Sequence, residues 1–303
     1  MRRPTRPPEM EFFRAARAPL GDANATLALD DLRVRLSGLD GPLEQALRVR
    51  FGPFLPRAET TDAPGSLEVS VAAETTDYFI DPPAIPEQNP ILLEVEGARV
   101  RYLGYRVAGW FDTVRSTGQL LLAQGDYEVP DRAMENYLRV AVAWLAISRG
   151  GALVHAASAV RNGRGYLFYG ESGAGKSTLS ASNRRGRVVS DDLTLVLPGP
   201  DGTPHVVGSP FRGTYEQGRA VLGRFPLAAG FRIVKAAVAE VRPVQRVRAM
   251  AELVGNLPFT AECFHRRPEL FEGVERTFAN CPLAHLHFRK DDTFWDAIDR
   301  AGL

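Results

Sequence analysis

The segment GESGAGKS, residues 170–177, constrains the fold of this 303-residue chain more than any other feature. It fits the pattern GxxxxGK[ST], in which glycines let successive backbone amides turn inward around phosphate oxygens. Such a loop is built between a β-strand and a helix. The apolar run GYLFY precedes it, and residues 177–184 are compatible with a short helix. We therefore expect an α/β unit organised around this loop.

The ligand that this loop predicts is a nucleotide. Lys176 would bridge the β and γ phosphates of ATP, and Ser177 would be a ligand of Mg²⁺. The lysine is informative because the chain has only two others, Lys235 and Lys290. The alternative is a glycine-rich turn that binds nothing. The nucleotide-binding residues that we expect are Gly170, Glu171, Ser172, Gly173, Ala174, Gly175, Lys176, Ser177 and Thr178.

An acidic pair follows the loop at an informative distance. Asp191 and Asp192 come directly after the short apolar strand RVVS, 15 and 16 residues beyond Lys176. That interval holds one helix, one turn and one strand, which is the chain order of an NTP site. A carboxylate there can reach the metal ion or the attacking hydroxyl. Aspartate pairs by themselves are usually turn or capping residues, so it is the spacing that favours a role in the site.

The same spacing argues against other classes of P-loop protein. ABC-type ATPases and most GTPases place their acidic strand much further along the chain and carry additional signatures. The sequence has no LSGGQ motif, no NKxD motif and no arginine-finger signal. We therefore do not expect a motor or a transporter subunit.

Length and composition predict two modules. The chain exceeds the usual size of one domain, and its 45% apolar and 24% charged residues can supply a large core. Residues 1–20, which begin with several prolines and arginines, are expected to form a flexible tail. Residues 21–130 form the expected N-terminal module, and residues 131–303 the expected P-loop catalytic domain. The fold class that we expect is α/β, or α+β over the whole chain.

The N-terminal module is expected to be mainly antiparallel β. Apolar residues alternate along most of its length, interrupted by Gly, Asp and Pro, and one helix is predicted near residues 42–50. Its aromatic residues Tyr78, Phe79 and Trp110 are interpreted as packing residues. A helix opened by Pro130 and ended near Gly150 then leads into the catalytic domain.

Charge and targeting signals narrow the partners and the location. The 37 basic and 36 acidic residues leave a net charge of +1, so we expect neither a nucleic-acid nor a membrane partner. The opening MRRPTRPPEM is not followed by an apolar signal region, and the apolar run at 140–147 is too short to span a bilayer. A cytoplasmic location is expected. Cys263 and Cys281 lack the spacing of a zinc site or a disulfide framework, which predicts reduced, structural thiols.

Two segments together carry a resemblance to a known family. HAASAVRNGRGYLFYGESGAGKSTLS and RRGRVVSDDLTLVL resemble the catalytic domain of the HPr kinase/phosphorylase family, most closely its shorter relatives, lasso-peptide tailoring kinases included. The specific match covers residues 153–197, and residues 282–298 are loosely similar to the end of those relatives. The resemblance implies a P-loop in a mixed sheet related to phosphoenolpyruvate carboxykinase, and phosphorylation of serine with ATP.

The resemblance also implies roles for three side chains. His155 lies on the strand before the loop strand, where a lone histidine is more often a packed core residue, but the family pattern implies that it belongs to the active site. Asp192 would be the base toward the serine hydroxyl, and Asp191 would lie beside the metal. The expected catalytic residues are thus Asp192, His155 and Lys176.

The segment GSPFRGTYEQGRAV, residues 208–221, supplies two further candidates. Glu216 could be a metal ligand, which makes the expected metal set Ser177, Asp191 and Glu216, and Arg212 could contact phosphate. Each is equally compatible with a solvated loop. Four other histidines, His205, His265, His285 and His287, have no metal-ligand spacing and are left out of the site.

The expected function is therefore that of a kinase that phosphorylates a hydroxyl with ATP and Mg²⁺. The acceptor would be a peptide, a protein or a small molecule, with a small peptide preferred because of the relatives. Two alternatives share the same loop: an ATP-binding regulator without phosphoryl transfer, and a simple nucleotide hydrolase. The resemblance also allows a homo-oligomer.

Overall fold

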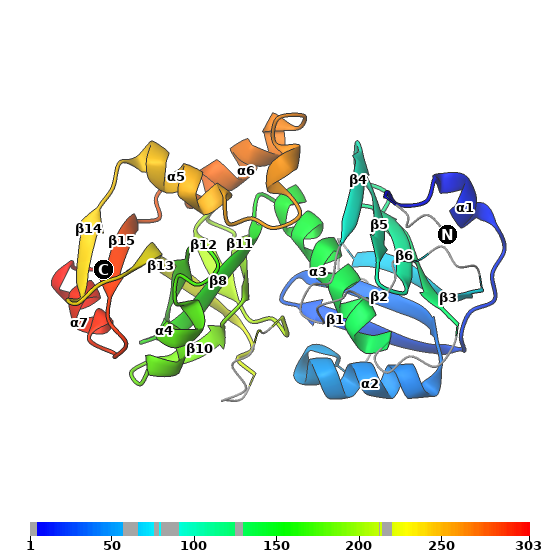
Figure 1. The fold of residues 1–303 in the computed structure, drawn as a ribbon, viewed down its shortest axis with the longest axis horizontal. Helices are drawn as coiled ribbons and strands as arrows, with labels where there is room; N and C mark the ends of the chain where they lie inside the picture. The colour runs from blue at the N-terminus through cyan, green and yellow to red at the C-terminus, as the bar shows by residue number, and fades with distance from the viewer. Residues whose placement is uncertain are drawn as a thin grey trace. The chain divides into compact units, whose positions relative to one another are not determined.

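The structure is a computed structural model that describes residues 5–56, 66–75, 79, 91–124, 130–211, 213 and 220–303. The chain divides into two compact units, Met1–Val142 and Ala143–Leu303. Each unit is built on its own sheet with helices, so the whole chain is a mixed α/β protein (Figure 1). The boundary falls inside helix α3, Pro130–Ser148, whereas the sequence analysis placed it at the start of that helix.

The first unit contains a seven-stranded sheet with the order β1-β2-β3-β7-β6-β5-β4. Pairs β2–β3 and β3–β7 are parallel, and the other pairs are antiparallel, as expected for most of this module. The helices are α1 (Met10–Arg14), α2 (Gly41–Phe51) and the short η1 (Gly52–Phe54). The strands are β1 (Ala23–Leu29), β2 (Leu32–Leu39), β3 (Ser66–Glu74), β4 (Leu92–Glu96), β5 (Arg99–Gly104), β6 (Val107–Asp112) and β7 (Thr117–Ala123).

Helix α2 confirms the helix predicted near residues 42–50. It begins where the Asp40 carboxylate accepts a hydrogen bond from the Leu43 amide at 2.8 Å, an N-terminal cap that satisfies one free backbone donor. Leu43, Leu47 and Phe51 follow at four-residue steps and are buried. This helix provides the crossover that a parallel β2–β3 pair requires.

Part of the segment expected to be a flexible tail packs against the sheet. Phe13 of α1 is buried in a cluster that includes Leu103 and Leu121. Arg17 forms an ion pair with buried Glu74, and Pro19 forms a bridge with Ala72. Residues 10–19 therefore belong to the first unit.

The aromatic residues of this module behave as packing residues where the structure describes them. Phe79 and Trp110 both pack against the same cluster around Phe13. The Trp110 carbonyl also accepts a hydrogen bond from the hydroxyl of Tyr137 at 2.9 Å. Tyr78 lies outside the described residues.

Helix α3 is buried along most of its length, from Met134 to Ile147. Its end is set by Gly150, which has a φ of 77°, so that a residue without a Cβ closes the helix, as predicted. Among the helices of the described ranges, none is both long enough and apolar enough to cross a bilayer.

The second unit contains an eight-stranded mixed sheet. Its path runs β10-β8-β11-β12-β13-β15-β14, with β9 paired to β8 and β13. Strands β9, β13 and β15 are parallel to one another, and the other pairs are antiparallel. The strands are β8 (Ala152–Arg161), β9 (Arg164–Tyr169), β10 (Arg187–Ser190), β11 (Leu193–Pro198), β12 (Pro204–Val207), β13 (Arg224–Lys235), β14 (Glu240–Pro243) and β15 (Leu283–Phe288).

Five helical segments complete this unit: α4 (Lys176–Ser182), α5 (Arg246–Val254), η2 (Ala261–Cys263), α6 (Pro268–Phe278) and α7 (Phe294–Arg300). Helices α4 and α7 cover one face of the sheet, where Phe168 packs with Phe231, Phe294 and Trp295. Phe168 is the penultimate residue of β9, so this aromatic core packs next to the point where the glycine-rich loop begins.

A two-residue turn sets the register between β8 and β9. Asn162 and Gly163 have φ angles of 51° and 76°, the left-handed pair that a tight hairpin needs, and Arg161 pairs with Arg164 across it. The hairpin predicted at these residues is confirmed. It fixes how far His155 lies from the loop at the end of β9.

The two cysteines carry thiols and differ in accessibility. Burial raises the pKa of the Cys281 thiol to about 12, whereas Cys263 is partly exposed. Because alkylation requires an accessible thiolate, we expect iodoacetamide at pH 8 to modify Cys263 well before Cys281 in the folded protein. Peptide mass spectrometry at timed intervals measures both sites. In denaturant the two cysteines should be alkylated at equal rates. Equal rates in the native protein as well would contradict the assignment of Cys281 to the core.

Candidate nucleotide-binding site

The glycine-rich loop has the strand–loop–helix form that the sequence predicts. Strand β9 ends at Tyr169, and α4 begins at Lys176. Gly175 has a φ of 110°, and a Cβ built on it would lie 2.8 Å from the Phe288 ring. Both the backbone angle and the close ring exclude larger residues at this position. The Phe288 ring at the end of β15 therefore restricts the conformation of the loop at Gly175.

This packing gives a testable prediction for Gly175. The change Gly175→Ala should weaken binding of a non-hydrolysable ATP analogue with Mg²⁺ about tenfold, because strain of about 1–3 kcal/mol and the Phe288 contact displace the loop. Isothermal titration calorimetry measures the affinity. Gly163→Ala is the matched control, since Gly163 also has positive φ but open space around its Cβ position. An unchanged affinity in Gly175→Ala would contradict the role given to the loop shape.

Lys176 is buried against the loop that precedes it. The residue is only 7% exposed. Its ammonium donates hydrogen bonds to the Gly170 carbonyl at 2.8 Å and to the Glu171 carbonyl at 3.3 Å. Burial lowers the pKa of this ammonium, and the nearby Asp192 carboxylate raises it, with burial the larger effect. The lysine side chain thus lies against the loop, and the charge that acts on it is that of Asp192, which follows β10.

The acidic pair lies at the turn between β10 and β11. Asp191 is 3% exposed, and its carboxylate accepts a hydrogen bond from the Gly213 amide at 2.8 Å. The hydroxyl of Ser190 accepts from the Asp192 amide at 3.2 Å and donates to the Phe211 carbonyl at 3.1 Å. These bonds hold Phe211 and Gly213 against the acid pair. Arg212 and Glu216, the two candidates in the segment of residues 208–221, lie outside the described residues.

His155 lies beside the second aspartate. It pairs with Leu193 across β8 and β11, and its Nε2 lies 3.4 Å from Oδ1 of Asp192. Both side chains are partly exposed, 38% for His155 and 29% for Asp192, so neither belongs to the core. Of the three side chains expected to be catalytic, Asp192 contacts His155, and the Asp192 charge raises the pKa of the Lys176 ammonium.

Two basic residues near the loop were missed in the sequence analysis. Arg232 on β13 donates to the Glu171 side chain at 3.2 Å, and its backbone is in register with Tyr169. The Cε atom of Lys235 lies 3.6 Å from the Cβ position of Gly175. The scarcity of lysine was a signal for Lys235. Arg232 had no sequence signal, because only the parallel pairing of β13 with β9 brings it to the loop.

The donors available for a Mg²⁺ ion are few. Within the described ranges, no group of three or more His, Cys, Asp and Glu side chains forms a metal cluster. Ser177 is exposed in the first turn of α4, and Asp191 lies at the acidic turn. Mg²⁺ bound with a nucleotide commonly uses one or two protein ligands together with phosphates and water. A hydroxyl and a carboxylate therefore fit this ion.

The remaining histidines do not extend this site. His285 and His287 are two residues apart on β15, so their side chains lie on the same face of the strand, as expected. His285 Nε2 is 2.6 Å from the Glu252 carboxylate of α5, which holds it in a structural pair. The same Glu252 carboxylate also forms ion pairs with Arg232 and Arg248.

Comparison with known proteins identifies the family. The sequence model of the SynChlorMet cassette protein ScmC matches residues 132–302, more than half of the chain. The chain belongs to the ScmC family. The ScmC match includes the loop, the acidic pair and His155, and it starts within α3. No curated protein matches the chain.

Proposed function

We propose that the protein is a kinase that transfers the γ-phosphoryl group of ATP to a hydroxyl. The observation that carries this proposal is the arrangement around Asp192: its carboxylate lies 3.4 Å from His155, and its charge acts on the loop lysine Lys176, whose pKa it raises. A protein that only binds ATP needs the loop but has no use for this carboxylate as a base. A hydrolase would use the same carboxylate to activate water, so the dependence of turnover on an acceptor distinguishes the hydrolase from the kinase.

Each residue has a role that follows from its position. The loop amides from Gly170 to Gly175 would bind the phosphate oxygens. The Lys176 ammonium would leave the Gly170 carbonyl and donate to the transferring phosphoryl group, where negative charge develops. Asp192 would accept the proton of the acceptor hydroxyl as its oxygen bonds to the γ-phosphorus and the bond to ADP breaks. His155 would hold the Asp192 carboxylate in position.

Ser177 and Asp191 are the residues that would hold Mg²⁺, which when bound neutralises charge on the phosphates. Asp191 is suited to a fixed ligand because the Gly213 amide orients its carboxylate. Glu216, the third metal ligand suggested by the sequence, remains a prediction.

The finer fold and the acceptor belong to this proposal as well. We assign the second unit to the HPr kinase and phosphoenolpyruvate carboxykinase type of P-loop domain, supported by a loop at the end of β9 in a mixed sheet and by the sequence resemblance. The acceptor would be a serine of a peptide or protein, or a small-molecule hydroxyl, and the reaction would take place in the cytoplasm.

Intact-mass spectrometry tests the proposal. Candidate peptides and the protein itself are incubated with ATP and Mg²⁺, in parallel with the Asp192→Asn variant. We expect the wild-type protein to add one phosphate to an acceptor and the Asp192→Asn variant to add none. ATP binding without any phosphorylated product would favour the regulator, and ADP release without an acceptor would favour the hydrolase.

A further inference from the structure

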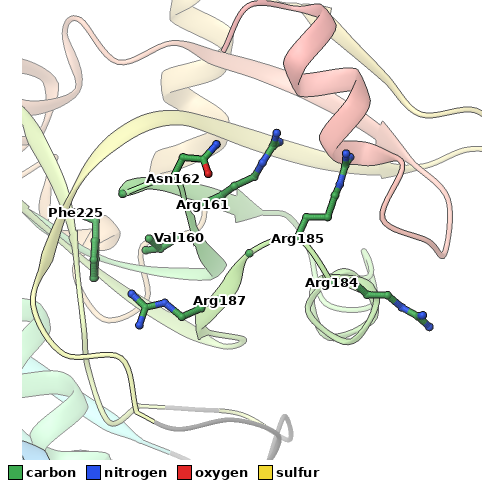
Figure 2. A pocket seen from close by; sticks show the side chains of 9 residues that line it. Val160, Arg161, Asn162, Arg184, Arg185, Arg187 and Phe225 are labelled. Atoms are coloured by element: carbon green, nitrogen blue, oxygen red, sulfur yellow. The ribbon is translucent and has the colours of Figure 1, made fainter.

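A pocket rich in arginine lies at the edge of the second unit's sheet, away from the glycine-rich loop. Its volume is about 410 Å³, and its walls include Arg161, Arg184, Arg185 and Arg187 together with Phe225 (Figure 2). The arginines come from the end of β8 and from the segment that leads into β10. None of these residues has a role in the proposed phosphoryl transfer.

Two of the four arginines are already neutralised by helix α7. Arg161 donates to Asp299 at 2.7 Å, and this bond raises the pKa of its guanidinium. Arg185 donates to Asp296 at 2.8 Å. Figure 2 shows both side chains directed toward that helix. Asp299 and Asp296 of α7 thus hold Arg161 and Arg185 in place at one side of the pocket.

The remaining positive charge is available to a ligand. Arg184 and Arg187 are exposed, and neither has an ion pair within the described ranges of the chain. The Nη1 atom of Arg161 is buried there without a hydrogen-bond partner. The same guanidinium lies over the Trp295 ring, 4.9 Å from its centroid, so Arg161 is a fixed part of the pocket wall.

The spread of the arginines indicates the kind of ligand. Figure 2 shows Arg187 directed toward Phe225, whereas Arg184 points away from the other three. Guanidinium groups that do not converge fit several carboxylates along a chain better than one compact ion. A single-stranded nucleic acid is disfavoured because such sites usually offer several aromatic rings on which bases stack, and among the described residues Phe225 is the one aromatic residue that lines the pocket.

We propose that this pocket binds the carboxylate side chains of an acidic peptide. If the protein is a kinase, as proposed above, that peptide is the acceptor. Arg187 begins β10, and five residues later the chain reaches Asp192. An extended chain of that length spans at most about 18 Å. Acidic residues about four to six positions from the acceptor serine would then occupy the pocket while the serine lies at Asp192.

Binding is tested first, without ATP. Fluorescence anisotropy measures the affinity of the full chain for labelled hexaglutamate and for hexaglutamine. The double variant R184Q/R187Q should weaken hexaglutamate binding about tenfold, since two exposed charge pairs are lost. The control R266Q/R276Q removes the same charge from two other exposed arginines of this unit and should leave the affinity unchanged.

Several outcomes would overturn the proposal. Equal weakening in both double variants would show a general charge effect, and equal binding of hexaglutamine would show that carboxylates are not recognised. Tighter binding of a labelled hexathymidylate would assign the pocket to nucleic acid. Full displacement of hexaglutamate by inorganic phosphate at constant ionic strength would assign it to a single small anion.

A second measurement separates this proposal from the kinase function. Peptides with one serine and four glutamates centred five positions away are compared with their glutamine counterparts in the phosphoryl-transfer assay. Transfer to both with equal efficiency would refute the acidic-peptide proposal and leave the kinase intact. Hexaglutamate binding that depends on Arg184 and Arg187, with no transfer to any peptide, would refute a peptide as the acceptor and leave the pocket's ligand unchanged.

Discussion

Replacing Lys176 with methionine is expected to reduce phosphoryl transfer about 10²–10³-fold while the protein stays folded. The ammonium donates to two loop carbonyls, and in the proposed mechanism it moves to the phosphoryl group during transfer. Loss of one donor aimed at developing negative charge typically has an effect of this size. Methionine retains the apolar stem that fills the buried position, so the core should tolerate it.

Steady-state phosphorylation assays and thermal unfolding measure the two effects together. Lys290→Met is the matched control, because Lys290 is exposed beyond the end of β15 and the substitution is chemically identical. The control should keep full activity. Wild-type transfer by a folded Lys176→Met protein would remove the loop lysine from the mechanism.

Replacing Asp192 with asparagine is expected to reduce transfer about 10²–10⁴-fold and to spare ATP binding. Asparagine keeps an oxygen that can face His155 but cannot accept the proton of the acceptor hydroxyl, which is the contribution of a general base. The affinity for nucleotide should hold because, in the proposed mechanism, the loop amides and Lys176 bind the phosphates.

Single-turnover phosphorylation and calorimetry with an ATP analogue test both halves of this prediction. Asp201→Asn provides the control, since Asp201 lies in the exposed turn between β11 and β12 and accepts hydrogen bonds that asparagine can also accept. If Asp192→Asn transferred phosphate at the wild-type rate, the base would have to be another residue. If it lost ATP binding as well, its role would lie in the loop's structure.

Local sequence signals predicted several parts of the second unit. Asn162 and Gly163 favour a tight hairpin because both residues tolerate positive φ, and the structure has that turn. The loop from Gly170 to Lys176 has the strand before it and the helix after it that its motif requires. In the first unit, the helix predicted near residues 42–50 is α2, and the Asp40 side chain caps its start.

Other features depended on contacts between distant parts of the chain. The segment at residues 10–19 has a tail-like composition, yet Phe13 and Arg17 find partners on β3 and β5 that no local pattern shows. The parallel pairs β2–β3 and β3–β7 are likewise not readable from alternation, which is the same for parallel and antiparallel edges that bury one face.

The loop, its lysine and the acid pair could be predicted from local properties of the chain, namely glycine positions, residue spacing and strand periodicity. The contact of His155 with Asp192, the approach of Arg232 to the loop and the four arginines around one pocket could not be predicted in this way. These contacts depend on the pairing of β8 with β11, of β9 with β13, and of β8 with β10. Strand pairing is set by the packing of the whole sheet, and its register moves every side chain that it carries.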